Sequence, residues 1–459
     1  MLKEVLKGTL IDEVRDIMVN YDPVNEDSTK SVLKSAGKLV PLVYVCNTNV
    51  PFGSIQYFEL SYGKDFLPQF ELSFNDNANF MFNDFPLVHD IATLYIGNTA
   101  DTEFKVIKAD FLIDNAEQDN GNIRISAHLF VDDALKQTMV QSFDDMTSID
   151  VIKKICEDTG LGLVTNIDGT DDKMTWLQCN ETYLSFIRRH VLRHMWLGKN
   201  KVVKAFIDPW YRLTIVDVFA EMEETPLDDT ITIDNIDGKE LPKPQKLILN
   251  NNVNGENWMS RFTKYGMTYN SASMRRPSAV NVVSMQHNLG EQSINVQTSQ
   301  PVIKQESTDK IWDTFADYTE QTAIQLAKRD PDHSNVHEHF YEAAAMYDWS
   351  QGMLDRVILS CTLQRTLNQL YAFKTLNVEI WSIKNKLEEP TKPDEKATDS
   401  PKRQPSVSQN AKNLRLSGKY ISTALKWNYT KSGKLSQTVE LQRRMWPVLD
   451  IDNMWEVNS

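Results

Sequence analysis

The chain has 459 residues, of which 41% are hydrophobic and 24% charged, so we expect ordinary hydrophobic cores and about three domains. Asp and Glu total 63 against 49 Lys and Arg, which gives a formal net charge of −14. This acidic balance argues against nucleic acid or an anionic lipid surface as the main partner, because both favour a basic protein surface.

Residues 39–143 are predicted to form a β-rich unit. Phe70, Leu72 and Phe74 alternate with polar residues, which is the period of a half-buried strand. Turn signals such as Asn120-Gly121 separate the apolar stretches. We expect strands at 39–46, 54–62, 70–74, 90–96, 104–113 and 122–130. Short strands without intervening helices favour a barrel or a sandwich.

A compact α+β unit of about 80 residues is predicted to follow. Ile149, Ile152 and Ile155 share one helical face, which predicts a helix over 148–157 that Ser148 is able to cap. We expect a strand at 161–167, a polar turn at 168–172, a helix at 182–194, and strands at 201–207 and 211–218.

The remaining chain is predicted to return to β structure around a helical segment. Residues 220–240 are expected to connect units or to form an edge, and 270–307 are polar with weak periodicity. We predict helices at 308–329 and 336–350, and strands at 245–250, 261–269, 356–362, 375–382, 418–429 and 434–443. The Pro-rich stretch 386–413 has too little apolar content to pack and is predicted to be a mobile excursion inside a domain.

Two groups of histidines have a spacing that metal sites use. His333, His337 and His339 lie close together, and two histidines four apart share a helix face. We favour an exposed, polar helix start over a zinc site, because structural zinc normally has four ligands. His190 and His194 lie beside Arg188, Arg189 and Arg193, and we favour a solvated helix face over a phosphate or metal site. We therefore assign no metal.

Carboxylates and tryptophans are the other candidate functional residues. A glycosidase needs two opposed carboxylates, and adjacent pairs on turns do not supply them, so we expect solvated turns at Asp132-Asp133, Asp144-Asp145, Asp171-Asp172 and Asp228-Asp229. The ten tryptophans suit either a carbohydrate platform or core anchoring, and we favour the core. Those in or beside predicted elements are Trp176, Trp196, Trp210, Trp312, Trp349, Trp381, Trp427 and Trp446.

Common catalytic and targeting signatures are not found. GxSxG, GxxxxGK[ST] and GxGxxG do not occur, and HExxH is not completed near His339, so we assign no catalytic residue and no cofactor. The four cysteines form no CxxC pair, which indicates synthesis in a reduced compartment. Acidic residues divide the first 18 residues, and no apolar run reaches the about 18 residues of a membrane span, so we expect neither a secretory signal nor membrane insertion.

The order of these units resembles that of phage baseplate (tail) hub proteins of the T-even type, from contractile-tailed phages. Residues 143–162 (FDDMTSIDVIKKICEDTGLG) look like the helix that opens the second domain of that family. Residues 174–196 are similar to its apolar-aromatic strand and helix, with Trp176, Tyr183 and Phe186 matching. Residues 205–218 look like the hairpin that closes that domain, and 418–446 resemble the last hairpin of the second barrel. Segments 270–307 and 386–413 exceed the family plan.

The resemblance implies a β-rich, α+β multidomain fold with two antiparallel β-barrels like those of the tail tube. The implied division is a first barrel at 1–142, an α+β domain at 143–225, a second barrel at 226–300 and 351–459, and a helical insertion at 301–350. Three subunits would place six barrels in a ring, with one face matching the six-fold tube and the other holding the three-fold spike.

The same resemblance implies a structural, non-enzymatic protein of the virion baseplate, made in the cytoplasm of a bacterial host. Its implied partners are two further copies of the chain, the central spike protein, the tail tube protein, and neighbouring baseplate wedge or sheath-initiator proteins. Genomic DNA would pass only in transit, and the acidic balance would help DNA to pass a lumen without sticking.

Three alternatives remain open. A tail-associated cell-wall hydrolase would need a pocket with opposed carboxylates. A carbohydrate-binding adhesin would need exposed tryptophans. A spike protein of the type VI secretion class, which shares related barrels, is expected to carry a long C-terminal β-helix, and residues 447–459 hold no such repeat.

Overall fold

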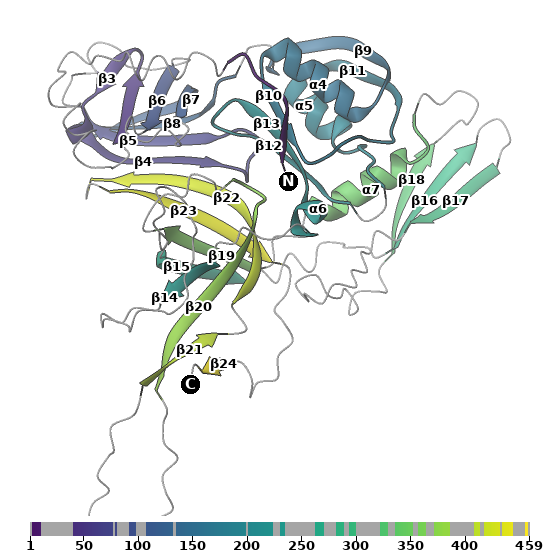
Figure 1. Ribbon diagram of the computed structural model, residues 1–459. Helices are drawn as coiled ribbons and strands as arrows, with labels where there is room; N and C mark the ends of the chain where they lie inside the picture. The colour runs from purple at the N-terminus through teal and green to yellow at the C-terminus, as the bar shows by residue number, and fades with distance from the viewer. Residues whose placement is uncertain are drawn as a thin grey trace, which may run out of the picture.

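The computed structural model is β-rich, and its elements fall into three packed units and a smaller insertion (Figure 1). The structure describes residues 2–10, 40–76, 79, 91–97, 107–131, 135–198, 201–223, 230–234, 262–269, 281–288, 293–299, 322–328, 336–351, 357–363, 371–385, 408–413, 417–431, 434–443 and 455–457. Among these residues, no helix is long and apolar enough to cross a membrane.

The first β unit confirms the six predicted strands. Their apolar side chains alternate into one core, in which Phe58, Phe70, Phe74 and Phe111 are fully buried. The strands run antiparallel in the order β4-β5-β8-β7-β6-β2-β3. Their bounds are β2 Val40–Val45, β3 Thr48–Val50, β4 Ile55–Tyr62, β5 Gln69–Asn75, β6 Ile91–Gly97, β7 Ile107–Asp119 and β8 Asn122–Leu129, with a short 3-10 helix, η1, at Phe52–Ser54.

The C-terminal β unit is built from segments that are distant in sequence. It contains β14 Thr230–Asp234, β15 Phe262–Tyr269, β19 Val357–Leu363, β20 Thr375–Asn385, β21 Ser408–Asn413, β22 Gly418–Thr430, β23 Lys434–Arg443 and β24 Trp455–Val457. One path runs β15-β19-β23-β22, and β20 pairs with β22, with β21 and, in parallel, with β14. The predicted strands of this region are confirmed, except 245–250, which lies outside the described residues.

The two β units share a hydrogen-bonded seam. β22 pairs antiparallel with β4 from Leu425 opposite Tyr62 to Thr430 opposite Tyr57. The described strands of both units therefore form one 15-stranded sheet (Figure 1). At the seam the rings of Phe58 and Tyr429 stack with centroids 5.8 Å apart. The described path ends at β3 and at β15, so a separate closed barrel in each unit stays a prediction.

The middle unit combines a four-stranded sheet, a two-stranded ribbon and helices. The sheet order is β1-β10-β13-β12, and β9 pairs with β11 in the ribbon. The strands are β1 Lys3–Leu6, β9 Thr138–Met146, β10 Gly162–Thr165, β11 Met174–Thr182, β12 Val203–Ile207 and β13 Arg212–Asp217. The N-terminal strand thus belongs to this unit rather than to the first, and β9 crosses the boundary drawn at residue 142.

Helices cover the middle unit largely where the sequence places them. α4 (Ser148–Thr159) ends at Gly160 in the left-handed conformation. Its cap is Thr147, whose side chain accepts from the Asp150 amide, and Ser148 is instead the first helical residue. The predicted helix 182–194 consists of α5 (Tyr183–Phe186) continuing into a π-helical turn, η3 (Ile187–Val191). α6 (Val218–Glu223) follows β13.

The insertion is a small sheet and one helix. Two of its strands lie within 226–300, which was expected to belong to the second barrel, and the third lies within the helical insertion expected at 301–350. β16 (Asn281–Asn288) pairs with β17 (Ser293–Ser299) and with β18 (Thr322–Lys328). The helix predicted over 308–329 is wrong at 322–328, where Ile324 and Leu326 also fit a period of two, and 308–321 lie outside the described residues. α7 (Phe340–Gln351) confirms the second helix.

The Pro-rich excursion is also partly corrected. Residues 408–413 of this stretch form β21, which pairs with both β20 and β24. Backbone hydrogen bonds to two neighbours hold a strand that has little apolar content of its own. Residues 386–407 lie outside the described part of the chain.

The seam predicts a strong effect of one buried side chain. Trp427 on β22 is 2% exposed and lies opposite Leu60 of β4. Trp427→Ala is expected to lower the free energy of unfolding by about 3–5 kcal/mol, measured by urea denaturation, because the neighbours close such a cavity only partly. Val140→Ala is the control, since Val140 is 80% exposed, and it should leave the urea midpoint unchanged. Equal midpoints for both variants would contradict a packed seam.

Candidate functional site

The places where units distant in sequence meet are the best-defined sites in this structure. The first is the segment 371–375, which leads into β20. Lys374 Nζ lies 2.8 Å from Glu221 Oε1, and Tyr371 Oη donates to the same oxygen at 3.1 Å. Glu221 belongs to α6 of the middle unit and is fully buried, and Lys374 is 8% exposed. Burial and the Glu221 carboxylate raise the pKa of Tyr371. A buried ion pair thus ties the C-terminal unit to the middle unit.

The same segment contacts β22 and the first β unit. Ser422 Oγ donates to the Tyr371 carbonyl at 2.8 Å and accepts from the Lys374 amide at 3.0 Å. The Phe373 ring lies 5.7 Å from that of Phe206 on β12. Gly63, which follows β4, lies against Ala372. Segment 371–375 therefore joins all three units, and we call it the three-way junction.

Two polar contacts reinforce the position of the middle unit against the first β unit. The Ile207 amide donates to the Phe66 carbonyl at 2.8 Å, and the Asp110 amide donates to Tyr211 Oη at the same distance. Burial raises the pKa of Tyr211, so this hydroxyl stays protonated at neutral pH. These contacts complement the apolar packing of Tyr62 against Trp210 and Phe206.

The second site is the α7 junction, which we define as His194, Trp196, His337, His339 and Phe340. The His194 and Phe340 rings stack with centroids 3.7 Å apart and an interplanar angle of 4°. Trp196 stacks on His339 at 4.4 Å. His337 Nε2 lies 2.9 Å from the His194 carbonyl oxygen, which fixes this nitrogen as the donor.

An ion pair flanks the α7 junction. Arg193 binds Asp348 of α7 through two hydrogen bonds of 3.1 and 2.7 Å, a bidentate geometry that strengthens and orients the pair. Arg193 and Asp348 are both partly exposed, so water screens the pair, and its contribution is smaller than that of a buried one. Stacked rings and a flanking ion pair therefore hold α7 on the middle unit.

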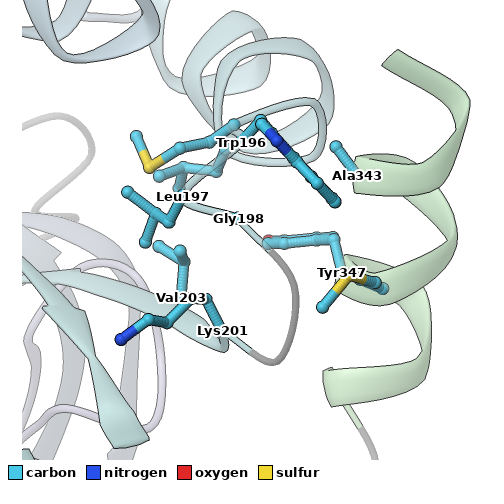
Figure 2. A pocket seen from close by; sticks show the side chains of 10 residues that line it. Trp196, Leu197, Gly198, Lys201, Val203, Ala343 and Tyr347 are labelled. Carbon is cyan, nitrogen blue, oxygen red and sulfur yellow. The ribbon is translucent and has the colours of Figure 1, made fainter. Parts of the chain in front are cut away.

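A pocket opens beside this junction, between α7 and the segment before β12 (Figure 2). Its lining is mainly apolar, and Figure 2 shows Tyr347 of α7 pointing toward Gly198, with Val203 across the space. Lys201 is the charged residue of the lining, and its Nζ lies 3.0 Å from Asp217 Oδ2. The lining is thus typical of packing between two units rather than of a site built for a charged ligand.

The structure corrects two predictions about the histidines, because His337 is buried instead of lying on an exposed helix start, and His194 is buried instead of lying on a solvated helix face. His337 and His339 contact the middle unit as given above, and His333 lies outside the described residues. His194 is 7% exposed, whereas the His190 side chain is half exposed beside Glu181. The described residues include no group of three His, Cys, Asp or Glu side chains that could hold a metal ion.

One carboxylate contradicts the prediction of solvated turns. Asp172 is fully buried, and it accepts hydrogen bonds from the Ser148 amide and hydroxyl, the Thr170 hydroxyl and the Trp196 amide. The hydrogen bond from the Ser148 amide holds the start of α4. The hydrogen bond from the Trp196 amide positions a residue of the α7 junction. Sequence reasoning missed it because an Asp-Asp pair in a polar turn gives no sign of burial. The pairs at 132–133 and 228–229 lie outside the described residues.

Four tryptophans confirm the prediction of core anchoring. Trp176, Trp196 and Trp427 are at most 5% exposed, and Trp210 packs partly buried beside Tyr62. The Trp176 indole also donates to the Met146 carbonyl across the β9–β11 ribbon, at 2.9 Å. Indole rings that are buried in this way are not available to stack on a sugar.

Comparisons with known proteins find similarity in fold. No protein-family model and no curated protein sequence matches the chain. The fold is similar to a tail protein from Neisseria meningitidis MC58, with a TM-score of 0.48 and 9% identity, over 88% of this chain and 96% of that one. A 43 kDa tail protein of prophage MuSo2 from Shewanella oneidensis gives 0.47 and 10%, over 88% and 98%. A component of the type VI secretion system from E. coli gives 0.38 and 9%, over 89% and 77%.

Similarities at this level do not assign a role to any residue. These solved structures are two tail proteins, one of them from a prophage, and a secretion-system component that is described as structurally similar to T4 bacteriophage tail proteins. With TM-scores below 0.5, the function of the chain depends on what its own residues support.

The buried ion pair of the three-way junction gives a first prediction for this site. Lys374→Met is expected to lower the free energy of unfolding by about 3–5 kcal/mol, because it leaves the Glu221 carboxylate buried without its partner. The double variant Glu221→Leu, Lys374→Met should recover most of this loss in urea denaturation. Lys173→Met is the control: its pair with Asp145 is exposed and should not change the midpoint. A double variant no more stable than Lys374→Met would contradict this account.

Gly63 gives a second prediction. Its φ is +98°, and a Cβ added to it would lie 2.6 Å from the Ala372 Cβ and 2.9 Å from the Thr423 carbonyl oxygen. Gly63→Ala should therefore lower the free energy of unfolding by about 1–3 kcal/mol through backbone strain, with the clash added. Gly53→Ala is a matched control, because a Cβ added at Gly53 would meet nothing within 4 Å. A Gly63 variant as stable as the Gly53 variant would contradict this prediction, because the three-way junction would then accommodate the added methyl group without strain.

Proposed function

We propose that the chain is a structural protein of a phage tail, acting as the hub of the baseplate. In this proposal three copies form a ring that joins the central spike to the tail tube and leaves a passage for DNA. The proposal places the protein in the virion and includes no catalytic step. Sequence resemblance at residues 143–162, 174–196, 205–218 and 418–446 supports this class of protein.

The observation that carries the proposal is the continuous sheet across the seam. A symmetry adaptor needs each subunit to present two similar elements in a fixed relation, so that three subunits offer six. β4 and β22 hydrogen-bond the two β units edge to edge, and the three-way junction holds the middle unit against both. Such a subunit would act as one rigid piece with two β-rich parts, which is what a pseudo-six-fold ring needs.

The implied contacts follow from the ring. Cyclic symmetry uses head-to-tail contacts, so each subunit must present two different patches to its neighbours. Joining β-rich units laterally would also cover sheet edges, which otherwise invite unwanted pairing. We propose the spike protein on one face of the ring and the tube protein on the other, with wedge or sheath-initiator proteins at its rim. The acidic composition fits a passage that DNA crosses without binding.

The solution mass of the purified chain tests this function. By light scattering we expect either a stable trimer of about 158 kDa, three times the 52.7 kDa of one chain, or a monomer that becomes a heavier 3:3 complex once the spike protein is added. A chain that stays monomeric and does not bind the spike protein would argue against the proposed role as a baseplate hub. Zymography on cell walls and glycan arrays would then test the hydrolase and adhesin alternatives.

A further inference from the structure

The α7 junction contains two buried histidines whose surroundings fit only their neutral form. His194 and His337 are 7% and 8% exposed. Nδ1 of His194 donates to the His190 carbonyl at 2.8 Å, and Nε2 of His337 donates to the His194 carbonyl at 2.9 Å. Each ring thus already uses the one N–H that a neutral imidazole carries. Nδ1 of His337 is buried and has no hydrogen-bond partner among the described residues.

Protonation would therefore oppose the packing of both rings. A second N–H on His337 would point at a place without an acceptor, and a buried charge loses its hydration. Stacking on Phe340 favours a charged His194 ring to some degree, as any aromatic face does for a cation. Burial outweighs this: it is the largest cause that lowers the pKa of His194, to about 4, and the pKa of His337 is lowered for the same reason.

The charged groups around the two rings come from three elements. Around His194, Arg193 in the turn after η3 and His190 on η3 oppose a further positive charge, and so does His337 from the α7 side. On the α7 side, His339 opposes the charging of His337, and it lies 3.4 Å from Glu342 while Asp348 is held by Arg193. From the turn before β11, Asp171 and Asp172 favour a charged His337, but Asp172 already accepts four hydrogen bonds.

The α7 junction also has a mechanical position in the molecule. α7 contacts β16 of the insertion on one side and the middle unit on the other, and Figure 1 shows it between α6 and the β16–β18 sheet. The cluster of Trp196, Ala343 and Met346 is separate from the main core of the chain. Releasing α7 would therefore free the insertion without opening the three-way junction or the seam.

We propose that the α7 junction is an acid-sensitive clasp, in which protonation of His194 and His337 releases α7 and the insertion from the middle unit. The clasp is fully formed above about pH 6.5, the ordinary pKa of histidine, and it weakens as the pH falls toward 4. Docking weakens as the pH falls because the released histidines bind protons more tightly than the docked ones. At pH 5, protonation of His194 alone should shift the docking equilibrium about 30-fold toward the released state, relative to pH 7.5.

Hydrogen–deuterium exchange tests the clasp on the full chain. Protection factors, corrected for the intrinsic effect of pH on exchange, are measured for residues 340–351 and, as an internal reference, for α4. We expect α7 to lose at least about 30-fold of its protection between pH 7.5 and pH 5 while α4 keeps its own. Unchanged protection of α7, or loss of α4 protection at the same pH, would overturn the proposal.

Substitutions assign the effect to the two histidines. His194→Phe keeps an aromatic ring on Phe340, and His337→Gln keeps an N–H donor for the His194 carbonyl, but neither titrates. The double variant should change less than about 3-fold between the two pH values, well below the loss expected for the wild type. His128→Gln, on β8 beside Asp114, is the matched control and should keep the wild-type loss. A double variant that still releases α7 at pH 5 would refute the assignment.

A further variant keeps both histidines and tests the same equilibrium. Asp348→Asn removes the charge that binds Arg193 and so weakens docking of α7 at every pH. Because both histidines remain, α7 should be less protected than in the wild type at pH 7.5 and at pH 5, with a similar fold loss of protection between the two pH values. Wild-type protection at pH 7.5, or a clearly smaller fold loss, would contradict the clasp even if the double variant failed to fold.

Discussion

The pairing of β4 with β22 is the constraint on which the rest of the structure depends. These strands are more than 350 residues apart, since Lys426 of β22 bonds Glu59 of β4 at a separation of 367 positions. Once they pair, the two β-rich units are one sheet, and segment 371–375 must pass close to the end of β4. The chain meets this demand with Gly63 at the point of closest approach and with a buried carboxylate on α6 that receives both Lys374 and Tyr371. The middle unit is then fixed by contacts with both β units.

Much of this architecture follows from local patterns in the sequence. Period-two alternation in stretches such as Phe70–Phe74 located the strands of the first unit, and the spacing of Ile149, Ile152 and Ile155 located α4. The burial of the indole side chains also follows from their residue type, since their large apolar area contributes most to stability when it is buried. These features depend on neighbours within a few residues, which a single sequence displays.

The features that sequence reasoning missed depend on distant partners. β1 completes the sheet of the middle unit by pairing with β10, about 160 residues later, and its four residues, two charged and then two apolar, do not indicate that pairing. Residues 322–328 carry apolar positions that suit both a helix and a strand, and the parallel partner β16 decides between them. Asp172 lies in a turn of polar residues, and only the approach of α4 and Trp196 buries it. The α7 junction likewise joins histidines at 194 and 337, which no spacing relates.

The seam also sets an order of events during synthesis. Ribosomes add about 5–20 residues per second, so roughly 20–70 s pass between the emergence of β4 and that of its partner β22. Until β22 is made, the edge of β4 that pairs with it has unpaired backbone donors and acceptors. Such an unpaired edge is able to pair with a strand of another nascent chain that is being made on the same mRNA. The final hairpin of β22 and β23 therefore closes an edge by which growing chains would otherwise cross-link, and productive folding competes with that intermolecular pairing until the last part of the chain is made.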